Sequence, residues 1–185
     1  MSYTTPIILI GPMGSGKSTI ARLLEEKIGL SNVPIDYIRW YYYFQHGFKL
    51  STQEQFQDFE DKANYWKQYD LIAIEKALLD FPKAIIDFGA GHSYYPDENQ
   101  LQQVREIIEK FPNVFLLLPS ADIEESYTIL SKRIRVLWPQ IEDGVVEYNR
   151  KFLEHPSNRI LSKHIIYSKD KSPEDNVEEI ISLLK

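Results

Sequence analysis

The sequence predicts an α/β fold in which five parallel strands form one sheet with helices on both of its faces. Three observations lead to this prediction. Short apolar runs alternate with longer amphipathic segments along the 185 residues, a glycine-rich motif joins the first run to the first helical segment, and turn residues separate the rest. Strands that alternate with helices usually pair in parallel through right-handed crossovers.

Composition limits the classes of protein that the chain can represent. A length of 185 residues suits a single domain, residues 1–185. The net charge of -6 and the pI near 5.3 argue against a nucleic-acid partner, since such proteins usually show a basic surface. The absence of cysteine excludes disulfides, thiolate metal sites and thiol nucleophiles. With no export signal and no long apolar run, we expect a cytoplasmic protein without a membrane partner, acting as a monomer or, alternatively, as a dimer.

Residues Gly11 to Ser18 read GPMGSGKS, which satisfies the P-loop (Walker A) pattern G-x-x-x-x-G-K-[ST]. A strand-like run, 6–10, precedes it, and a helix-like segment from Lys17 to Ile28 follows and ends at Gly29. Such a loop wraps its amides around a phosphate at a helix N-terminus. A chance glycine turn is the alternative, and the two flanks argue against it. The residues expected to bind the phosphates of ATP are Gly11, Met13, Gly14, Ser15, Gly16, Lys17, Ser18 and Thr19, with the Ser18 hydroxyl also suited to Mg²⁺.

The remaining elements follow from periodicity and end signals. Further strands are expected at 33–36, 84–88, 114–118 and 164–167. Ser51 and Glu54 form a capping box that predicts a long helix to about Asp80. Other helices are expected at 96–110, 122–135, 141–153 and 172–184. Because ligands bind at the carboxyl ends of parallel strands, the P-loop, Asp36, 87–91, the segment after Leu118 and 168–173 should meet in one cleft.

In their order and spacing these pieces resemble the shikimate-kinase-like branch of the nucleoside monophosphate kinase group. The matching segments are GPMGSGKST at 11–19, Asp36 after the second strand, IIDFGAG at 85–91, LSKRIRVLWPQ at 130–140 and HIIYSKDKSPEDNVEEIISLL at 164–184. The resemblance implies a three-layer P-loop kinase fold, ATP and Mg²⁺ as cofactors, and a small-molecule acceptor. It also implies an acceptor-binding helical region at about 37–80 and a short lid at about 135–144.

The acceptor side departs from the family pattern. The family's Asp-x-Asp is reduced to Asp36, because Pro34 stands at its first position. Ala90 replaces the middle glycine of the turn after the third strand, and the family's carboxylate-gripping arginine has no clear counterpart in the third helix. The lid sequence is altered to RVLWPQ. The donor side therefore matches and the identity of the acceptor stays open.

The resemblance assigns a role to each candidate residue. Asp36 would orient or deprotonate the acceptor hydroxyl, although a helix N-cap is an equally natural use of aspartate. Asp87 would help to hold Mg²⁺ and could replace the missing carboxylate, the alternative being a capped strand end. Lys17 and Arg133 would stabilise the transferred phosphoryl group. Arg133 and Pro173 would border the nucleotide, and the remaining acceptor contacts are expected from Arg39, Gly89, Ala90 and Gly91.

The aromatic segment is interpreted as a packed edge of the core, with a stacking wall for the acceptor as the alternative; its members are Trp40, Tyr41, Tyr42, Tyr43, Phe44 and Phe48. The four histidines show no metal-ligand spacing and are interpreted as incidental.

Together these features predict an ATP-dependent phosphotransferase that moves the γ-phosphoryl group to a hydroxyl of a small molecule. A nucleoside or nucleotide kinase is one alternative. The other is an ATP-binding switch or scaffold with little turnover.

Overall fold

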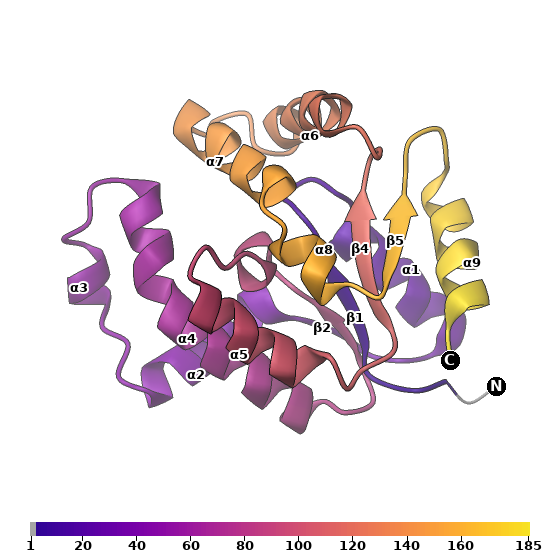
Figure 1. Cartoon of the computed structure of the whole chain (residues 1–185), viewed down its shortest axis with the longest axis horizontal. Helices are drawn as coiled ribbons and strands as arrows, with labels where there is room; N and C mark the ends of the chain where they lie inside the picture. The colour runs from indigo at the N-terminus through magenta and orange to yellow at the C-terminus, as the bar shows by residue number, and fades with distance from the viewer. Residues whose placement is uncertain (1–2) are drawn as a thin grey trace.

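The computed structural model describes residues 3–185 and contains a five-stranded, all-parallel sheet with the strand order β2-β3-β1-β4-β5 (Figure 1). The strands are β1 (Ile7–Ile10), β2 (Asn32–Pro34), β3 (Ile85–Asp87), β4 (Val114–Leu118) and β5 (His164–Tyr167). β1 lies at the centre, between β3 and β4. The chain moves to one side of β1 for the next two strands and to the other side for the last two, which opens a crevice at the carboxyl ends.

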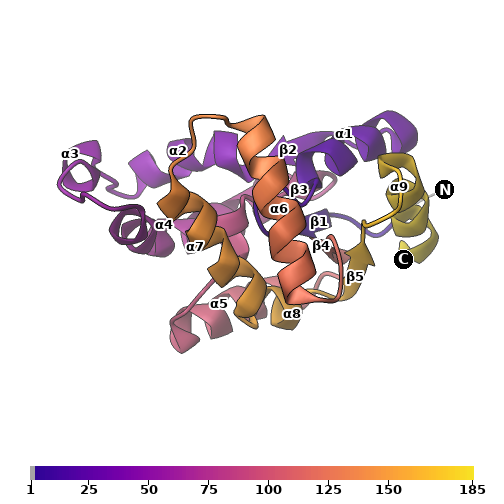
Figure 2. The same ribbon diagram turned by 90° about the horizontal axis from the view of Figure 1, so that it is seen from above.

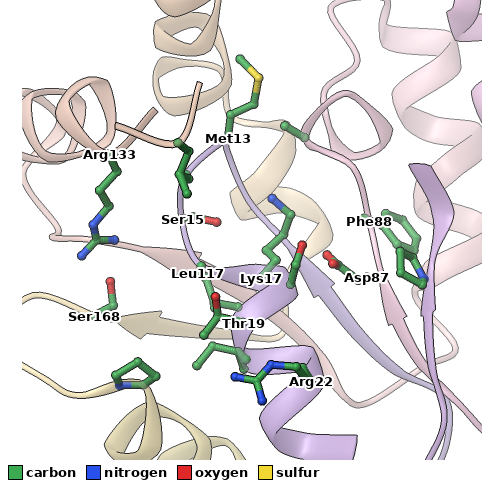
Figure 3. Close-up of a pocket in the computed structure, with 18 of the residues that line it drawn as sticks. Met13, Ser15, Lys17, Thr19, Arg22, Asp87, Phe88, Leu117, Arg133 and Ser168 are labelled. Carbon is green, nitrogen blue, oxygen red and sulfur yellow. The ribbon is translucent and has the colours of Figure 1, made fainter. Parts of the chain in front are cut away.

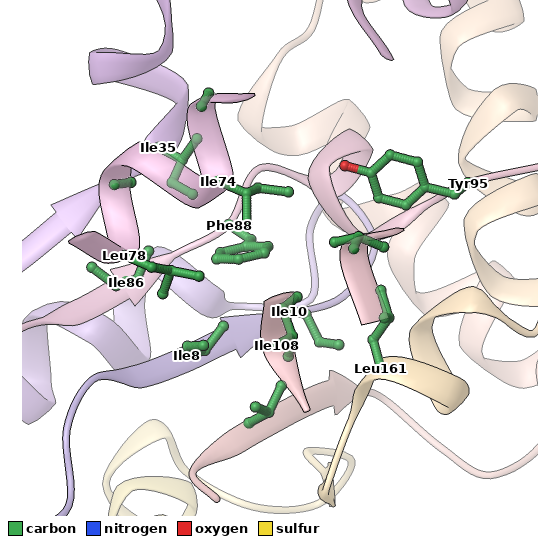
Figure 4. Packing of buried hydrophobic residues seen from close by; sticks show 14 of the residues in the cluster. Ile8, Ile10, Ile35, Ile74, Leu78, Ile86, Phe88, Tyr95, Ile108 and Leu161 are labelled. Carbon is green, nitrogen blue, oxygen red and sulfur yellow. The ribbon is translucent and has the colours of Figure 1, made fainter. Parts of the chain in front are cut away.

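Both faces of the sheet are buried, because successive residues of a strand point to opposite sides. Ile7 and Leu9 pack with α1 (Lys17–Ile28) and α9 (Pro173–Leu183) on one face. Ile8 and Ile10 pack on the other face against a larger cluster, part of which Figure 4 shows. The three-layer α/β fold predicted from the sequence is therefore confirmed.

The larger cluster includes side chains of α2 (Ile35–Gln45), α4 (Phe59–Asp80), α5 (Glu98–Ile108) and α8 (Ser157–Leu161). Two further helices, α6 (Ile123–Leu137) and α7 (Asp143–Glu154), pack against each other beyond the carboxyl ends of the strands (Figures 1 and 2) and also add buried residues to this cluster. The short elements α3 (Leu50–Gln53) and η1 (Ala90–Ser93) complete the described chain. Within residues 3–185, no helix is both long enough and apolar enough to cross a bilayer.

The prediction that the long helix begins at Ser51 is wrong. Residues near Ser51 form only the single turn α3, and α4 begins at Phe59. The Asp58 side chain caps α4 by accepting a hydrogen bond from the backbone N–H of Asp61, at 2.8 Å. Two further acidic residues in the first turn favour this start through the helix dipole. The helix α8 was not expected from the sequence.

The second strand ends earlier than predicted. β2 stops at Pro34, which lies in register with Asp87 of β3. Asp36 therefore lies in the first turn of α2 and is neither the strand end nor the N-cap, which is Pro34. The first helical turn holds the Asp36 carboxylate beside the carboxyl end of β3.

Most of the aromatic segment belongs to the core. Tyr42, Tyr43 and Phe48 are buried in the larger cluster, with Trp40 packed against them. Tyr41 and Phe44 are exposed on the outer side of α2. The core interpretation of the segment is thus confirmed for its inward-facing residues.

The cap of α4 yields a paired prediction. Asp58→Ala is expected to lower the free energy of unfolding by about 1 kcal/mol, because the N–H of Asp61 loses its acceptor. Ser51→Ala should change it by less than about 0.5 kcal/mol. Urea denaturation of the two variants measures both values, and a larger cost for Ser51→Ala would contradict the assigned start of α4.

Candidate functional site

The P-loop has the backbone conformation that its glycines permit. Gly11, Gly14 and Gly16 have φ values of 142°, 75° and 99°. At Gly11 a Cβ would also lie 2.6 Å from the carbonyl oxygen of Leu117, so the loop passes too close to β4 for any side chain. These angles are strained for other residues. The glycines therefore let the backbone turn sharply between β1 and the N-terminus of α1.

Lys17 lies folded across this loop. Its buried Nζ donates hydrogen bonds to the carbonyl oxygens of Gly11, at 2.9 Å, and Pro12, at 3.0 Å. Burial lowers the pKa of Lys17, and the nearby carboxylates of Asp87 and Asp36 partly oppose that shift. The lysine thus stabilises the shape of the loop and places a donor group at its centre.

Asn149, on α7, binds the other side of the loop. The backbone N–H of Met13 donates to its Oδ1 at 2.8 Å, and its Nδ2 donates to the Met13 carbonyl at 3.2 Å. The side chain is fully buried, so both ends of the amide are used. Sequence reasoning missed Asn149, since a single asparagine in an amphipathic helix carries no pattern.

A cavity of about 1220 Å³ lies at the carboxyl ends of the strands (Figure 3). It exceeds the roughly 300–1,000 Å³ of most small-ligand pockets, so it has room for two substrates. In Figure 3, Arg133 comes from α6 and Ser168 from the loop after β5, while Lys17 and Asp87 lie near each other at the base of α1. The residues predicted from sequence that line it are Met13, Gly14, Ser15, Gly16, Lys17, Ser18, Thr19, Asp36, Asp87, Ala90, Arg133 and Pro173.

Three residues that were predicted to contact the acceptor do not line the cavity: Arg39, Gly89 and Gly91. Gly89 supports Asp36 from behind, because a Cβ at Gly89 would overlap the Asp36 carboxylate. Gly91 accepts a hydrogen bond from Lys67 Nζ through its carbonyl group. The structure thus explains glycine at position 89 through its contact with Asp36, whereas the Gly91 carbonyl would be present with any residue.

Arg39 packs against aromatic rings. Its guanidinium lies 4.6 Å from the ring centroid of Trp40 and 4.8 Å from that of Trp66, in cation–π geometry. It is 3.7 Å from Asp36 Oδ1 and its side chain is 16% exposed. Arg39 is therefore the arginine nearest to the Asp36 carboxylate. It lies on α2, whereas the arginine of the family pattern belongs to the third helix.

Asp87 and Arg133 lie on different walls of the cavity. Asp87 is buried at the end of β3; burial raises its pKa, while the Lys17 charge and a Ser18 hydrogen bond act against that rise. Arg133 faces the cavity, whereas Arg135 turns away and forms an ion pair with Asp143 at 2.7 Å.

A group of buried polar side chains lies behind Asp36. His92 and Asp70 are almost fully buried, with His92 Nε2 3.3 Å from Asp70 Oδ1. Asp70 also accepts hydrogen bonds from Lys67, at 3.2 Å, and from the Tyr43 hydroxyl. Burial favours the protonated acid, but the facing His92 ring, whenever it is protonated, the Lys67 charge and the Tyr43 hydroxyl outweigh it and lower the pKa of Asp70. His92, interpreted from the sequence as incidental, is therefore part of this buried polar group.

Metal binding would depend on few protein ligands. Among residues 3–185, no group of three or more acidic or histidine side chains is arranged to hold an ion. The Ser18 hydroxyl and the Asp87 carboxylate both line the cavity beside Lys17. Oxygen donors of this kind suit Mg²⁺, which keeps several waters and takes phosphate oxygens as ligands.

Comparison with known proteins places this site in context. No family model matches the sequence. Shikimate kinase of Flavobacterium psychrophilum is 25% identical over 180 residues, which cover 96% of this chain and 98% of that protein. The bifunctional shikimate kinase/3-dehydroquinate synthase of Thermotoga maritima is 27% identical over 154 residues, covering 78% of this chain and 28% of the larger protein.

Solved structures show the same fold. Shikimate kinase from Acinetobacter baumannii, in complex with shikimate, superposes with a TM-score of 0.67 at 19% identity, covering 96% of this chain and 90% of that one. A gluconokinase from Sinorhizobium meliloti gives 0.58 at 16% identity, covering 99% and 93%. The chain therefore resembles shikimate kinases in sequence along most of its length, and it shares the fold of shikimate kinase.

Proposed function

We propose that the protein transfers the γ-phosphoryl group of ATP to a hydroxyl group of a small-molecule acceptor. The observation that carries the proposal is that the P-loop and Asp36 line one cavity. A phosphate cradle and a carboxylate that can orient a hydroxyl are the two parts that in-line phosphoryl transfer needs. The likeness to shikimate kinases and a gluconokinase supports the same reaction class.

The donor side would use main-chain amides and two cations. The amides of the P-loop and the N-terminus of α1 would hold the phosphates of ATP, with Lys17 turning from the loop carbonyls to the terminal phosphates. Arg133 would add positive charge from α6 as charge spreads over the transferred group. The loop around Ser168 and Pro173 would border the adenine.

Mg²⁺ fits this site through Ser18 and Asp87, whose oxygens lie next to the cradle. When bound, the ion would neutralise phosphate charge during transfer. Pro34 pairs with Asp87 in the sheet and has no carboxylate of its own, so Asp87 supplies the carboxylate at the ends of these two strands. We therefore assign the role of the missing first aspartate to Asp87.

The acceptor side would be organised by Asp36. Its side chain is 55% exposed, so a hydroxyl can approach it from the cavity, and Gly89 fixes its rear position. It would orient the hydroxyl and accept its proton. We assign acceptor binding to the helical region 37–80 and closure to a lid at 135–144. Val136, Leu137 and Trp138, around the start of that lid, are exposed apolar residues of the cavity wall whose closure would exclude water.

A panel of acceptors tests the proposed reaction. ADP release from Mg-ATP is measured with shikimate, gluconate, other polyols and nucleosides, against water alone. At least one hydroxyl compound should raise the rate above the water background. If ATP binds and no acceptor raises the rate of ADP release, the protein is an ATP-dependent switch and the proposed reaction is wrong.

The monomeric state expected from the sequence stays a prediction.

Lys17→Ala tests the donor side. The variant is expected to lose the thermal stabilisation that Mg-ATP gives to the wild-type protein, because the cradle loses its central cation. Lys83→Ala, at an exposed lysine far from the cavity, is the matched control and should keep the full shift. Differential scanning fluorimetry measures both, and an unchanged shift in Lys17→Ala would remove this residue from the site.

Asp36→Asn tests the acceptor side. Turnover is expected to fall about 100-fold or more while the affinity for ATP is retained, since the amide cannot take the proton. Asp97→Asn is the control, because asparagine caps α5 as well as aspartate does. Equal losses of ATP affinity and turnover in Asp36→Asn would instead point to a metal or structural role.

Gly89→Ala tests the support behind Asp36. The new methyl group displaces the carboxylate, so turnover should fall about 100-fold while the ATP-dependent thermal shift remains. Gly29→Ala, at a φ of 73° in the C-cap of α1, is the control: it should cost stability and leave turnover unchanged. Full turnover in Gly89→Ala would show that the position of Asp36 is not critical.

A further inference from the structure

His92 lies between two carboxylates. Its Nδ1 is 3.8 Å from Asp36 Oδ1, on the cavity side, and its Nε2 is 3.3 Å from Asp70 Oδ1, on the buried side. The ring is 1% exposed, and neither nitrogen makes a hydrogen bond of good geometry to the described residues. A buried imidazole in this state calls for an explanation, because unpaired buried polar atoms are costly.

Asp70 determines which ring nitrogen carries the proton. Its carboxylate is almost fully buried, and it already accepts hydrogen bonds from Lys67 and from the Tyr43 hydroxyl. A neutral imidazole has one N–H group, and the closer, buried carboxylate favours that group on Nε2. The lone pair of Nδ1 then points toward Asp36.

We propose that His92 receives, through Nδ1, the proton that Asp36 takes from the acceptor hydroxyl, with Asp70 holding the imidazole in the required tautomer. The inference rests on the proposed function. Neither His92 nor Asp70 touches the acceptor, so both are positioning residues that act through Asp36. The 3.8 Å separation is longer than a hydrogen bond, so the transfer requires the Asp36 side chain, which is 55% exposed, to move closer to His92.

The charges around His92 suit this role. Asp36 and Arg39 face the ring from α2, and Lys67 and Asp70 face it from α4. Burial lowers the pKa of His92, against the opposing effect of the two carboxylates, so the ring is neutral near pH 7 and can accept a proton. Once protonated, the imidazolium lies beside the buried Asp70 carboxylate. Tyr43, Tyr95 and Tyr148 also interact with Asp70; burial raises the pKa of each, so all three stay neutral.

The proton balance of the step is complete. As the acceptor oxygen bonds to the γ-phosphorus, the bond from that phosphorus to the oxygen of the β-phosphate breaks and ADP leaves. The acceptor proton passes to Asp36 and from there to His92 Nδ1. After product release it returns through Asp36 to water, so the net products are phosphorylated acceptor, ADP and one proton.

The tautomer of His92 in the resting protein is the first test and needs no turnover. Nitrogen-15 NMR of the wild-type protein should show the ring signals of its four histidines. The signal that is missing from the spectrum of His92→Gln then identifies His92. The expected result at pH 7 is a neutral ring with the proton on Nε2. Asp36→Asn should keep this tautomer and lower the pKa of His92, because a carboxylate that raises it is lost. A proton on Nδ1, or no response to Asp36→Asn, would overturn the relay.

Turnover of His92→Gln is the second test. With Mg-ATP and either water or an active hydroxyl compound as acceptor, kcat should fall about tenfold while the KM for ATP stays within about twofold. His164→Gln is the control, because His164 is the first residue of β5 and the cavity lies at the carboxyl ends of the strands. This variant should keep the wild-type kcat. An unchanged kcat in His92→Gln would overturn the relay. If the wild-type protein transfers phosphate to no acceptor while the NMR results hold, the proposed reaction fails and the Asp36–His92–Asp70 geometry stands.

Discussion

Burial of β1 between β3 and β4 is the constraint on which the rest of the structure depends. All four residues of β1 are fully buried, with Ile7 and Leu9 on one face and Ile8 and Ile10 on the other. This fixes the register of both neighbours. A one-residue slip would move each apolar side chain to the opposite layer. The same register brings the P-loop, Asp87 and the loop after β4 to one edge of the sheet.

The buried charges at that edge form two linked groups. Lys17 lies with Asp87 beneath the P-loop, and Lys67 pairs with Asp70 behind Asp36. Each charge faces an opposite charge or carbonyl oxygens within its own group, which offsets part of the cost of burying it. Asp36 lies where the two groups meet, and its carboxylate is more exposed than those of Asp70 and Asp87. This arrangement joins the place where phosphate would bind to a chain of groups able to take up a proton.

Local signals in the sequence predict the fold and the place of the P-loop between β1 and α1 well. The P-loop is a contiguous motif, and the apolar runs of the five strands stand out because a parallel sheet is buried on both faces. The capping box at Ser51 predicts too early a start for α4, because the acidic cap at Asp58 competes with it and begins the helix at Phe59. Asp36 lines the cavity as expected, although it lies in the first turn of α2 and not at the end of the strand.

The rest of the site depends on contacts that no local pattern records. His92, Asp70 and Asn149 each lie on a separate element, and only the packing of α4 and α7 around η1 and the P-loop brings them to the site. The role of Gly89 likewise follows from the Asp36 carboxylate, which lies far from it in sequence. A buried histidine or asparagine on an apolar face is predicted from sequence only as a core residue.

The most direct test of the central claim is a crystal structure with Mg²⁺ and a non-hydrolysable ATP analogue. The β- and γ-phosphates are expected in the P-loop, with Lys17 released from the Gly11 and Pro12 carbonyl groups. The Asp36 carboxylate is expected to face the γ-phosphate across a space large enough for a hydroxyl group. Phosphates bound outside the loop, or an Asp36 carboxylate turned away from them, would contradict the proposed site.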